Sequence, residues 1–229
     1  MIWVWILVAS AVVIGFHAAL KIIGHGEGDV AQSLHLVRRF QHFATGMLFL
    51  AIYHFVDQTQ ARWLITIPTI CFIIFDICRR KVFPRLNEWF ISHWEWLLRP
   101  HEQWDSPPAA LFFLAGVMVI VYLTTQRDIV ILSILNVSIC DPAASIIGIL
   151  VGGPKITSKK SISGSLGAAT CGTIAALIYH FISGVEINFI LAFVIALLSE
   201  LITVPYIDDN FTIPVFTCSL WMAAKAIFY

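Results

Sequence analysis

Three features of the chain predict an all-α integral membrane protein. Hydrophobic residues make up 59% of its 229 residues, charged residues make up only 12%, and the mean hydropathy is +0.86. The apolar residues form long uncharged runs, and a backbone in lipid satisfies its hydrogen bonds within helices. The length suits about eight transmembrane helices in one domain over residues 1–229, without a large extramembrane domain.

Eight apolar runs are long enough to cross or nearly cross a membrane. They cover residues 2–20, 41–57, 63–78, 109–125, 129–151, 165–183, 187–204 and 211–228. The first run could be taken for a secretory signal, but it lacks a basic start and a convincing cleavage site. We therefore expect residues 1–24 to provide an extra N-terminal span.

The basic residues predict an orientation. Eleven of the fourteen lysines and arginines fall in the loops after the first, third and fifth runs. Because short loops rich in these residues stay in the cytosol, we expect those loops there and both termini on the opposite side. The net charge is zero and no basic run exceeds Arg79-Arg80-Lys81, which argues against nucleic acid as a partner.

Residues 80–106 differ from the spans in their pattern of apolar and polar residues. Polar residues separate apolar ones that recur at steps of three and four. The apolar residues are Phe83, Leu86, Phe90, Trp94 and Leu97. This pattern predicts an amphipathic helix in the membrane interface, where its tryptophans suit the headgroup region. Such a helix could be a simple anchor, or a gate through which a lipid reaches a site.

An aspartate, Asp141, falls near the middle of the fifth apolar run and is followed by Pro142. The pair predicts a break in the span, with Asp141 capping a new helix that begins at the proline. A broken span is tolerated where it lines a water-filled cavity. Asp141 is then either a cap alone or, as is more common for an acid at this depth, a group that serves a metal, a proton or a substrate.

The stretch over residues 148–164 predicts a helix end, a Gly-Gly-Pro turn, a basic loop and a new helix opening near Ser161 to Ser165. Lys159 and Lys160, with the N–H groups of the new helix, could bind phosphates. The segment has no Walker A pattern. The alternatives are that the lysines only follow the positive-inside rule and that the serines only cap the helix.

Two further polar segments carry candidate ligands. Asp208-Asp209-Asn210 could hold a divalent cation through oxygen ligands, or could simply favour a turn. Glu200 could join these residues or form a structural pair with a lysine. Arg38 and Arg39, just before the second run, could grip a lipid or nucleotide phosphate.

In their order along the chain, these motifs resemble the polyprenol kinase superfamily of membrane lipid kinases that use CTP. The resemblance rests on Asp-x-x-Ala-x-x-x-Gly from Asp141, Lys-Ser-x-x-Gly-Ser from Lys160, then Ser199-Glu200 and the segment from Asp208 to Pro214. It covers about residues 33–228 and is strong only from 138 to 217, within a catalytic motif region at residues 129–217. The last two pieces look most like the CTP-dependent diacylglycerol kinases of the fungal type.

The residues and the resemblance together give three sets of expected site residues. The catalytic set is Asp141, Lys160, Arg38 and Arg39; the nucleotide-binding set is Gly148, Lys159, Ser161, Gly164, Ser165 and Asn210; the set for Mg²⁺ or another divalent cation is Asp141, Asp208 and Asp209. The resemblance implies transfer of the γ-phosphoryl group of CTP to diacylglycerol, giving phosphatidate. It also implies an endoplasmic reticulum or nuclear envelope membrane, while the distribution of the basic loops predicts that the site faces the cytosol.

Other functions remain open from the sequence. Phytol and dolichol kinases share much of the pattern, and a cytidylyltransferase acting on phosphatidate shares its Asp and Lys portion. A transporter or scaffold could also place broken helices at an ion site, although no inverted repeat is evident. The expected partners are the bilayer, a lipid alcohol and a nucleotide, and the oligomeric state is undetermined.

Overall fold

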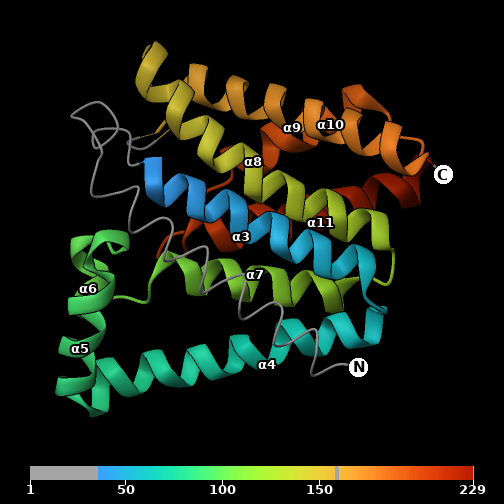
Figure 1. The fold of residues 1–229 in the computed structure, drawn as a ribbon. Helices are drawn as coiled ribbons and strands as arrows, with labels where there is room; N and C mark the ends of the chain where they lie inside the picture. The colour runs from blue at the N-terminus through green and yellow to red at the C-terminus, as the bar shows by residue number, and fades with distance from the viewer. Residues whose placement is uncertain (1–35, 158–159, 229) are drawn as a thin grey trace.

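The computed structural model describes residues 36–157 and 160–228, and helices dominate this part of the chain. The expected first span lies outside the described residues, while each of the other predicted apolar runs coincides with a helix. These helices lie side by side in Figure 1. They are α3 (Leu36–Phe55), α4 (Gln58–Ile77), α7 (Ala109–Leu123), α8 (Arg127–Val151), α9 (Ile162–Ser183), α10 (Phe189–Leu201) and α11 (Asp209–Phe228).

The helices have the length and composition of membrane spans. Within the described residues, four stretches are long and apolar enough to cross a bilayer: Gln58–Val82, Arg127–Val151, Ile162–Ser183 and Asp209–Phe228. Helices α7 and α10 are apolar but shorter. Large apolar side chains such as Ile74, Ile178 and Ile190 are exposed on the outside of the bundle. Lipid tails are as apolar as these side chains, so a bilayer can cover them without cost. The prediction of an all-α membrane fold is confirmed.

The predicted interfacial segment consists of short helices set across one end of the bundle (Figure 1). Helix α4 runs into a π-helical turn, η1 (Cys78–Val82). Three short helices follow: α5 (Pro84–Trp94), η2 (Glu95–Leu97) and α6 (Pro100–Trp104). We expected one continuous helix, and that expectation was wrong. Pro84 and Pro100 each open a new helix, because proline holds the residue before it away from the helical conformation.

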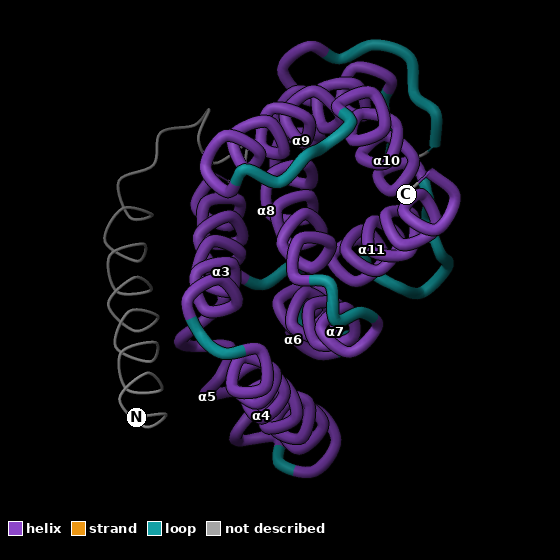
Figure 2. The backbone as a smooth tube through the Cα atoms, turned by 90° about the vertical axis from the view of Figure 1, so that its right-hand side faces the viewer, coloured by secondary structure: helices purple, strands orange, loops and turns teal. Residues whose placement is uncertain are grey.

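Helix α8 is the central element of the bundle. Figure 2 looks along the helices and shows α8 among α3, α9 and α11, with α4 at the periphery against α7. Small residues allow these close contacts: a Cβ atom on Gly46 of α3 would collide with Ser138 of α8, and one on Gly172 of α9 with Cys140. Such small residues are typical of helix interfaces in membranes.

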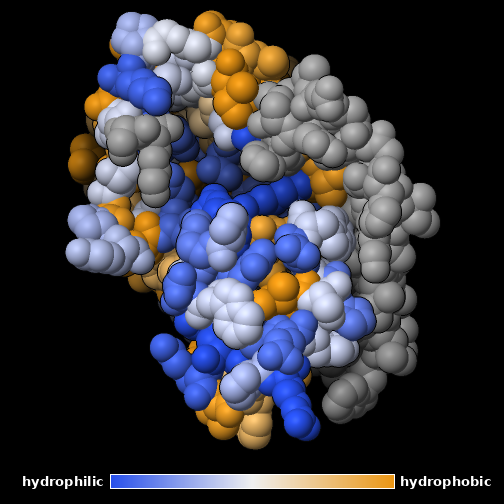
Figure 3. Space-filling view, turned by 90° about the vertical axis from the view of Figure 1, so that its left-hand side faces the viewer, coloured by the Kyte–Doolittle hydropathy of each residue, from blue (hydrophilic) through white to orange (hydrophobic). Residues whose placement is uncertain are grey.

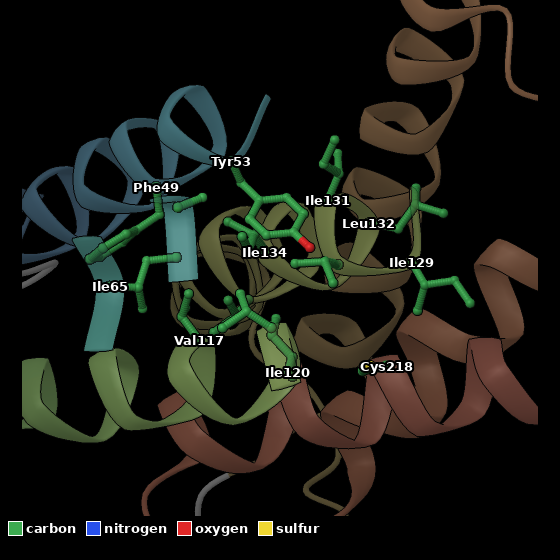
Figure 4. Packing of buried hydrophobic residues seen from close by; sticks show 14 of the residues in the cluster. Phe49, Tyr53, Ile65, Val117, Ile120, Ile129, Ile131, Leu132, Ile134 and Cys218 are labelled. Atoms are coloured by element: carbon green, nitrogen blue, oxygen red, sulfur yellow. The ribbon is translucent and has the colours of Figure 1, made fainter. Parts of the chain in front are cut away.

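The apolar core lies away from the end that carries α5 and α6. Figure 4 shows its isoleucines and valines from α7 and α8 packed against aromatic side chains of α3. Tyr53, Ile120, Ile131 and Ile134 are completely buried there. Because the core occupies the opposite half of the bundle, polar groups can gather at the end crossed by α5 and α6.

The predicted break at Pro142 is wrong, because α8 runs without interruption from Arg127 to Val151. Proline removes one backbone donor and crowds the preceding turn. The missing N–H would have bonded to the carbonyl of Ser138, one turn earlier in the helix. Proline is tolerated in membrane helices that neighbouring helices support, and α8 is packed against α3, α9 and α11. Asp141 therefore sits inside an intact helix and does not cap a new one.

Candidate functional site

The predicted motif segments meet at the end of the bundle where α5 and α6 cross it. The N-terminal ends of α3, α9 and α11 and the C-terminal ends of α8 and α10 all reach this end. Figure 3 looks directly at it and shows hydrophilic residues gathered over a surface that is hollowed near its centre. Segments far apart in the sequence thus contribute to one polar region.

Lys160 lies at the centre of the polar region and is only 6% exposed. Its ammonium donates to the backbone carbonyl of Glu200, and Nζ lies 3.6 Å from Glu200 Oε1 and 3.2 Å from Asp209 Oδ2. The sequence allowed Glu200 either a ligand role or a pair with a lysine, and the structure shows the pair. Lys159 lies outside the described residues.

Asp141 and Arg39 come together on the α3 side of this cluster. The Asp141 carboxylate interacts electrostatically with Arg39, Glu200 and Asp209. Arg39 also donates through Nη2 to Ser145 Oγ at 2.5 Å. The sequence reasoning missed Ser145, although its spacing of four residues from Asp141 places both on one face of α8.

Arg38 and Asp208 are connected by a chain of ion pairs through α6. Arg38 Nη2 lies 3.4 Å from Glu102 Oε1, and Arg99 Nη1 lies 2.9 Å from Asp208 Oδ2. Glu102 links the two pairs because its Oε2 accepts from the Arg99 backbone N–H at 2.8 Å. The sequence reasoning missed Arg99 and Glu102. A glutamate three residues after a helix start was the available signal, since it can cap that helix.

Asp208 acts as a cap at the start of α11. Its Oδ1 accepts from the Asn210 backbone N–H at 3.0 Å, and its Oδ2 is held by Arg99. Asp209 instead faces Lys160. In the described part of the chain, no three His, Cys, Asp or Glu side chains form a group that could hold a metal ion. The expected metal ligands Asp141, Asp208 and Asp209 are therefore not gathered around one point.

The glycines and serines of the nucleotide motif hold α8 against α9. Ser161 caps α9 by accepting from the Gly164 N–H at 3.2 Å, and the Ile162 N–H is bonded to the Pro154 carbonyl. A Cβ atom on Gly148 would lie 2.9 Å from Ser161 Oγ. Two of the donors expected to meet phosphate are thus engaged within the protein, and the glycines allow close packing of the two helices.

Gly164→Ala is expected to destabilise the contact between α8 and α9. The added Cβ atom would lie 2.6 Å from the Ala144 carbonyl oxygen, and neither backbone can move without shifting its helix. We expect a loss of about 1–3 kcal/mol, the usual cost of overpacking. Thermal unfolding in detergent measures it, with Thr170→Leu at an exposed position of α9 as the control. Equal melting temperatures for the two variants would contradict the close contact.

Four buried polar atoms of the described residues have no hydrogen-bond partner, and all belong to predicted site residues or to Glu200: Arg39 Nη1, Ser165 Oγ, Glu200 Oε2 and Asn210 Oδ1. Buried polar groups are normally hydrogen-bonded, so an unpaired buried atom indicates a place where a ligand, ion or water can bind. The first two can donate to an anion, and the last two can be ligands of a cation. The polar region is therefore suited to bind an anion and a cation together.

A polar contact that the sequence reasoning missed ties three helices together beneath the site. Asn136 Nδ2 of α8 donates to Ser199 Oγ of α10 at 2.8 Å and to Thr217 Oγ1 of α11 at 2.6 Å. A single asparagine in an apolar run was the available signal, because such residues bond across membrane helices. The contact fixes how α10 and α11 present Glu200 and Asp209 to Lys160.

Asp208→Asn is expected to keep the fold and most of the activity, whereas Asp209→Asn should lose much more of it. Asparagine caps a helix as well as aspartate does, so α11 should still start correctly. Only the ion pair with Arg99, which is 42% exposed, would be lost. Turnover and melting temperature of the two variants test this. A stable but inactive Asp208→Asn protein would instead make Asp208 a metal ligand.

Comparison with curated proteins finds similar fungal enzymes. The chain is 28% identical over 214 residues to the CTP-dependent diacylglycerol kinase 1 of Eremothecium gossypii, covering 82% of this chain and 66% of that protein. It is 27% identical over 222 residues to the protein of the same name in Saccharomyces cerevisiae, covering 86% and 75%. The match to that of Schizosaccharomyces pombe is 34% over 87 residues, covering 36% and 38%.

The chain spans about two thirds of the length of the Eremothecium relative. No family model matches the chain. No solved structure matches it. The matches to the fungal proteins nevertheless cover most of this chain and agree with the motifs read from its sequence. The resemblance is confirmed as a similarity of this chain to fungal proteins named CTP-dependent diacylglycerol kinase 1.

Proposed function

We propose that the protein is a membrane lipid kinase that transfers the γ-phosphoryl group of CTP to the hydroxyl of diacylglycerol, giving phosphatidate and CDP. The observation that carries the proposal is the convergence of Lys160, Arg39 and Asp141 with two further acids at one end of a membrane-type bundle. The similar fungal proteins are named for this activity. Positive charge beside carboxylates is what phosphoryl transfer requires.

Asp141 is the proposed general base. As the lipid oxygen attacks the γ-phosphorus, its proton passes to the Asp141 carboxylate, and the bond from the γ-phosphorus to the β–γ bridging oxygen breaks. CDP leaves with that oxygen. Lys160, Arg38 and Arg39 would neutralise the phosphate charge, since positioning and charge neutralisation supply most of the catalysis in this reaction class.

A divalent cation such as Mg²⁺ would supply further neutralisation of the phosphates. The orphaned carboxylate and amide oxygens of Glu200 and Asn210 fit such an ion chemically. Of the ligands expected from the motifs, Asp209 remains a proposed ligand, while Asp141 is assigned the alternative role of proton acceptor. Asp208 is a weaker candidate because both of its carboxylate oxygens already accept bonds from Arg99 and Asn210.

The proposed location is the endoplasmic reticulum or nuclear envelope, with the site facing the cytosol. The end of the bundle that bears the site also carries most of the basic residues of the chain, as expected for a cytosolic face. On α5 and α6, Trp89 and Trp104 are about half exposed, which suits contact with lipid headgroups. The hydroxyl of diacylglycerol lies at that depth, so the lipid would reach the site from the interface.

The test is to incubate the purified protein with γ-labelled CTP and, in separate reactions, diacylglycerol, phytol, dolichol or phosphatidate. We expect labelled phosphatidate from diacylglycerol and competition by unlabelled CTP that exceeds competition by ATP. Label in phytol or dolichol phosphate would identify a different lipid kinase. Label in pyrophosphate would identify a cytidylyltransferase. Absence of turnover with every lipid would contradict the kinase and favour a transporter or scaffold.

A further inference from the structure

We propose that Lys160 occupies the position of a divalent cation, that Glu200 is a ligand of this cation, and that the cation releases Lys160 to bind phosphate. Lys160 and the cation would compete for the same oxygen atoms. The role of the released lysine rests on the proposed kinase function, whereas the competition for the oxygens does not. The proposed carboxylate ligands are therefore Glu200 and Asp209, and Asp208 is not among them.

The first observation is the chemistry around the Lys160 ammonium. It meets the backbone carbonyl of Glu200, one carboxylate oxygen of Glu200 at 3.6 Å and one of Asp209 at 3.2 Å. One carbonyl and two carboxylates are the ligands that hard divalent cations prefer. An ammonium can stand in for such an ion because it is a compact point charge with three donors, although it carries only half the charge.

The second observation is independent of the lysine. Glu200 is only 4% exposed, yet its Oε2 has no hydrogen-bond partner. A buried carboxylate oxygen without a partner is costly, and Lys160 contacts only the other oxygen of the group. Since both oxygens belong to one carboxylate that faces the cluster, Oε2 is placed to complete the coordination of an ion that replaces the ammonium.

The end of α10 supplies the carbonyl ligand. The helix ends at Leu201, so the Glu200 carbonyl is among the last four, which have no partner within the helix. These carbonyls carry the partial negative charge of the helix end, which favours a cation. The Glu200 residue thus offers a carbonyl and a carboxylate at one place, from a helix held in position by the contact of Ser199 with Asn136.

The charges of the cluster favour a second cation. Among the described residues, the carboxylates of Glu200 and Asp209 both pair with the single ammonium of Lys160, while Asp141 interacts with Arg38 and Arg39. Lys160 directly precedes the cap of α9 at Ser161. The flexible stem of the lysine can therefore turn its ammonium from the acids to a phosphate at the start of α9.

The test measures Mn²⁺ binding to the purified protein in lipid nanodiscs, by electron paramagnetic resonance, without nucleotide or diacylglycerol. The Mn²⁺ affinity of Lys160→Met should be at least about tenfold higher than that of the unmodified protein, because a competing positive charge is removed. Glu200→Gln and Asp209→Asn should each weaken binding about tenfold. Glu186→Gln, at an exposed position between α9 and α10, is the matched control and should bind like the unmodified protein.

If Lys160 were only a structural partner of Glu200, its removal would not improve Mn²⁺ binding. A folded Lys160→Met protein with unchanged or weaker affinity therefore overturns the proposal. A measurement on the unmodified protein covers the case in which the variant does not fold. Mn²⁺ should increase the labelling of Lys160 by an amine-reactive probe, read by mass spectrometry, and unchanged labelling overturns the proposal as well.

The result is separable from that of the kinase assay. If the protein phosphorylates diacylglycerol but shows neither tighter Mn²⁺ binding in Lys160→Met nor increased labelling, only the proposed exchange of Lys160 for a cation is contradicted. If both the Mn²⁺ affinity and the labelling change as expected but no lipid is phosphorylated, only the proposed kinase function is contradicted.

Discussion

Asp141→Asn is expected to lower the rate of phosphoryl transfer about 100- to 10,000-fold, the range for loss of a general base. The substitution keeps the size of the side chain and removes only the charge and the basic oxygen. The protein should still insert and fold, because α8 continues through this position and is held by its packing against α3, α9 and α11. Initial rates with labelled CTP and diacylglycerol, together with the melting temperature, measure both effects.

Asp128→Asn is the matched control for this experiment. It removes a carboxylate from the same helix but at the opposite end of the bundle, where Asp128 accepts from the Tyr179 hydroxyl at 2.9 Å. An asparagine oxygen can accept the same bond, so activity and stability should stay near those of the unmodified protein. An Asp141→Asn protein as active as this control would remove Asp141 from the mechanism.

Asp76→Ala is expected to cause the largest loss of stability, about 3–5 kcal/mol, the usual cost of leaving one partner of a buried ion pair alone. Arg79 has no exposed surface, and its Nη2 lies 2.7 Å from Asp76 Oδ1. Asp76 also binds Arg80, at 2.6 Å. Asp76 and Arg79 are three residues apart, a spacing that places both side chains on one face of a helix. Thermal unfolding of the purified protein measures the loss.

The same substitution should loosen α5 and α6 from the end of α4. Arg79 donates to Asn87 Oδ1 at 2.5 Å and to backbone carbonyls of α6, and its guanidinium lies 4.3 Å from the centre of the Phe90 ring. Limited proteolysis should therefore cut residues 95–108 faster in Asp76→Ala. Asp105→Ala, which removes an exposed acid nearby, serves as the comparison. Similar melting and cleavage of the two variants would show that Arg79 does not depend on Asp76.

Local patterns in the sequence predicted most of the helices. Hydropathy located the described apolar helices because each has to bury or shield its own backbone in lipid. The start of α9 at Ser161 and the pairing of Asp76 with Arg79 were also readable, since both depend on residues within one or two turns. The prediction at Pro142 was wrong because α8 continues through the proline, packed against α3, α9 and α11, and this packing is not visible in a local pattern.

The site was predictable as a set of residues but not as an arrangement. The distribution of basic loops places Arg38, Lys160 and Asp208 on one side of a membrane, and the structure has all three at one end of the bundle. The partners of these residues were not predictable. Arg38 binds Glu102, and Asp208 binds Arg99. Glu102 lies on the short helix α6 and Arg99 directly precedes it, far from the motifs in sequence.

The amino-acid order alone thus specifies a membrane bundle, the positions of its helices and the residue types of the proposed phosphoryl-transfer site. Helix packing decides which atoms of that site meet. The rotation and depth of each helix depend on contacts such as that of Gly164 with Ala144, and these determine that Glu200 and Asp209 converge on Lys160 while Asp208 turns away. Hydropathy and helical spacing describe one helix at a time, whereas the fit between neighbouring helices is a property of the whole bundle.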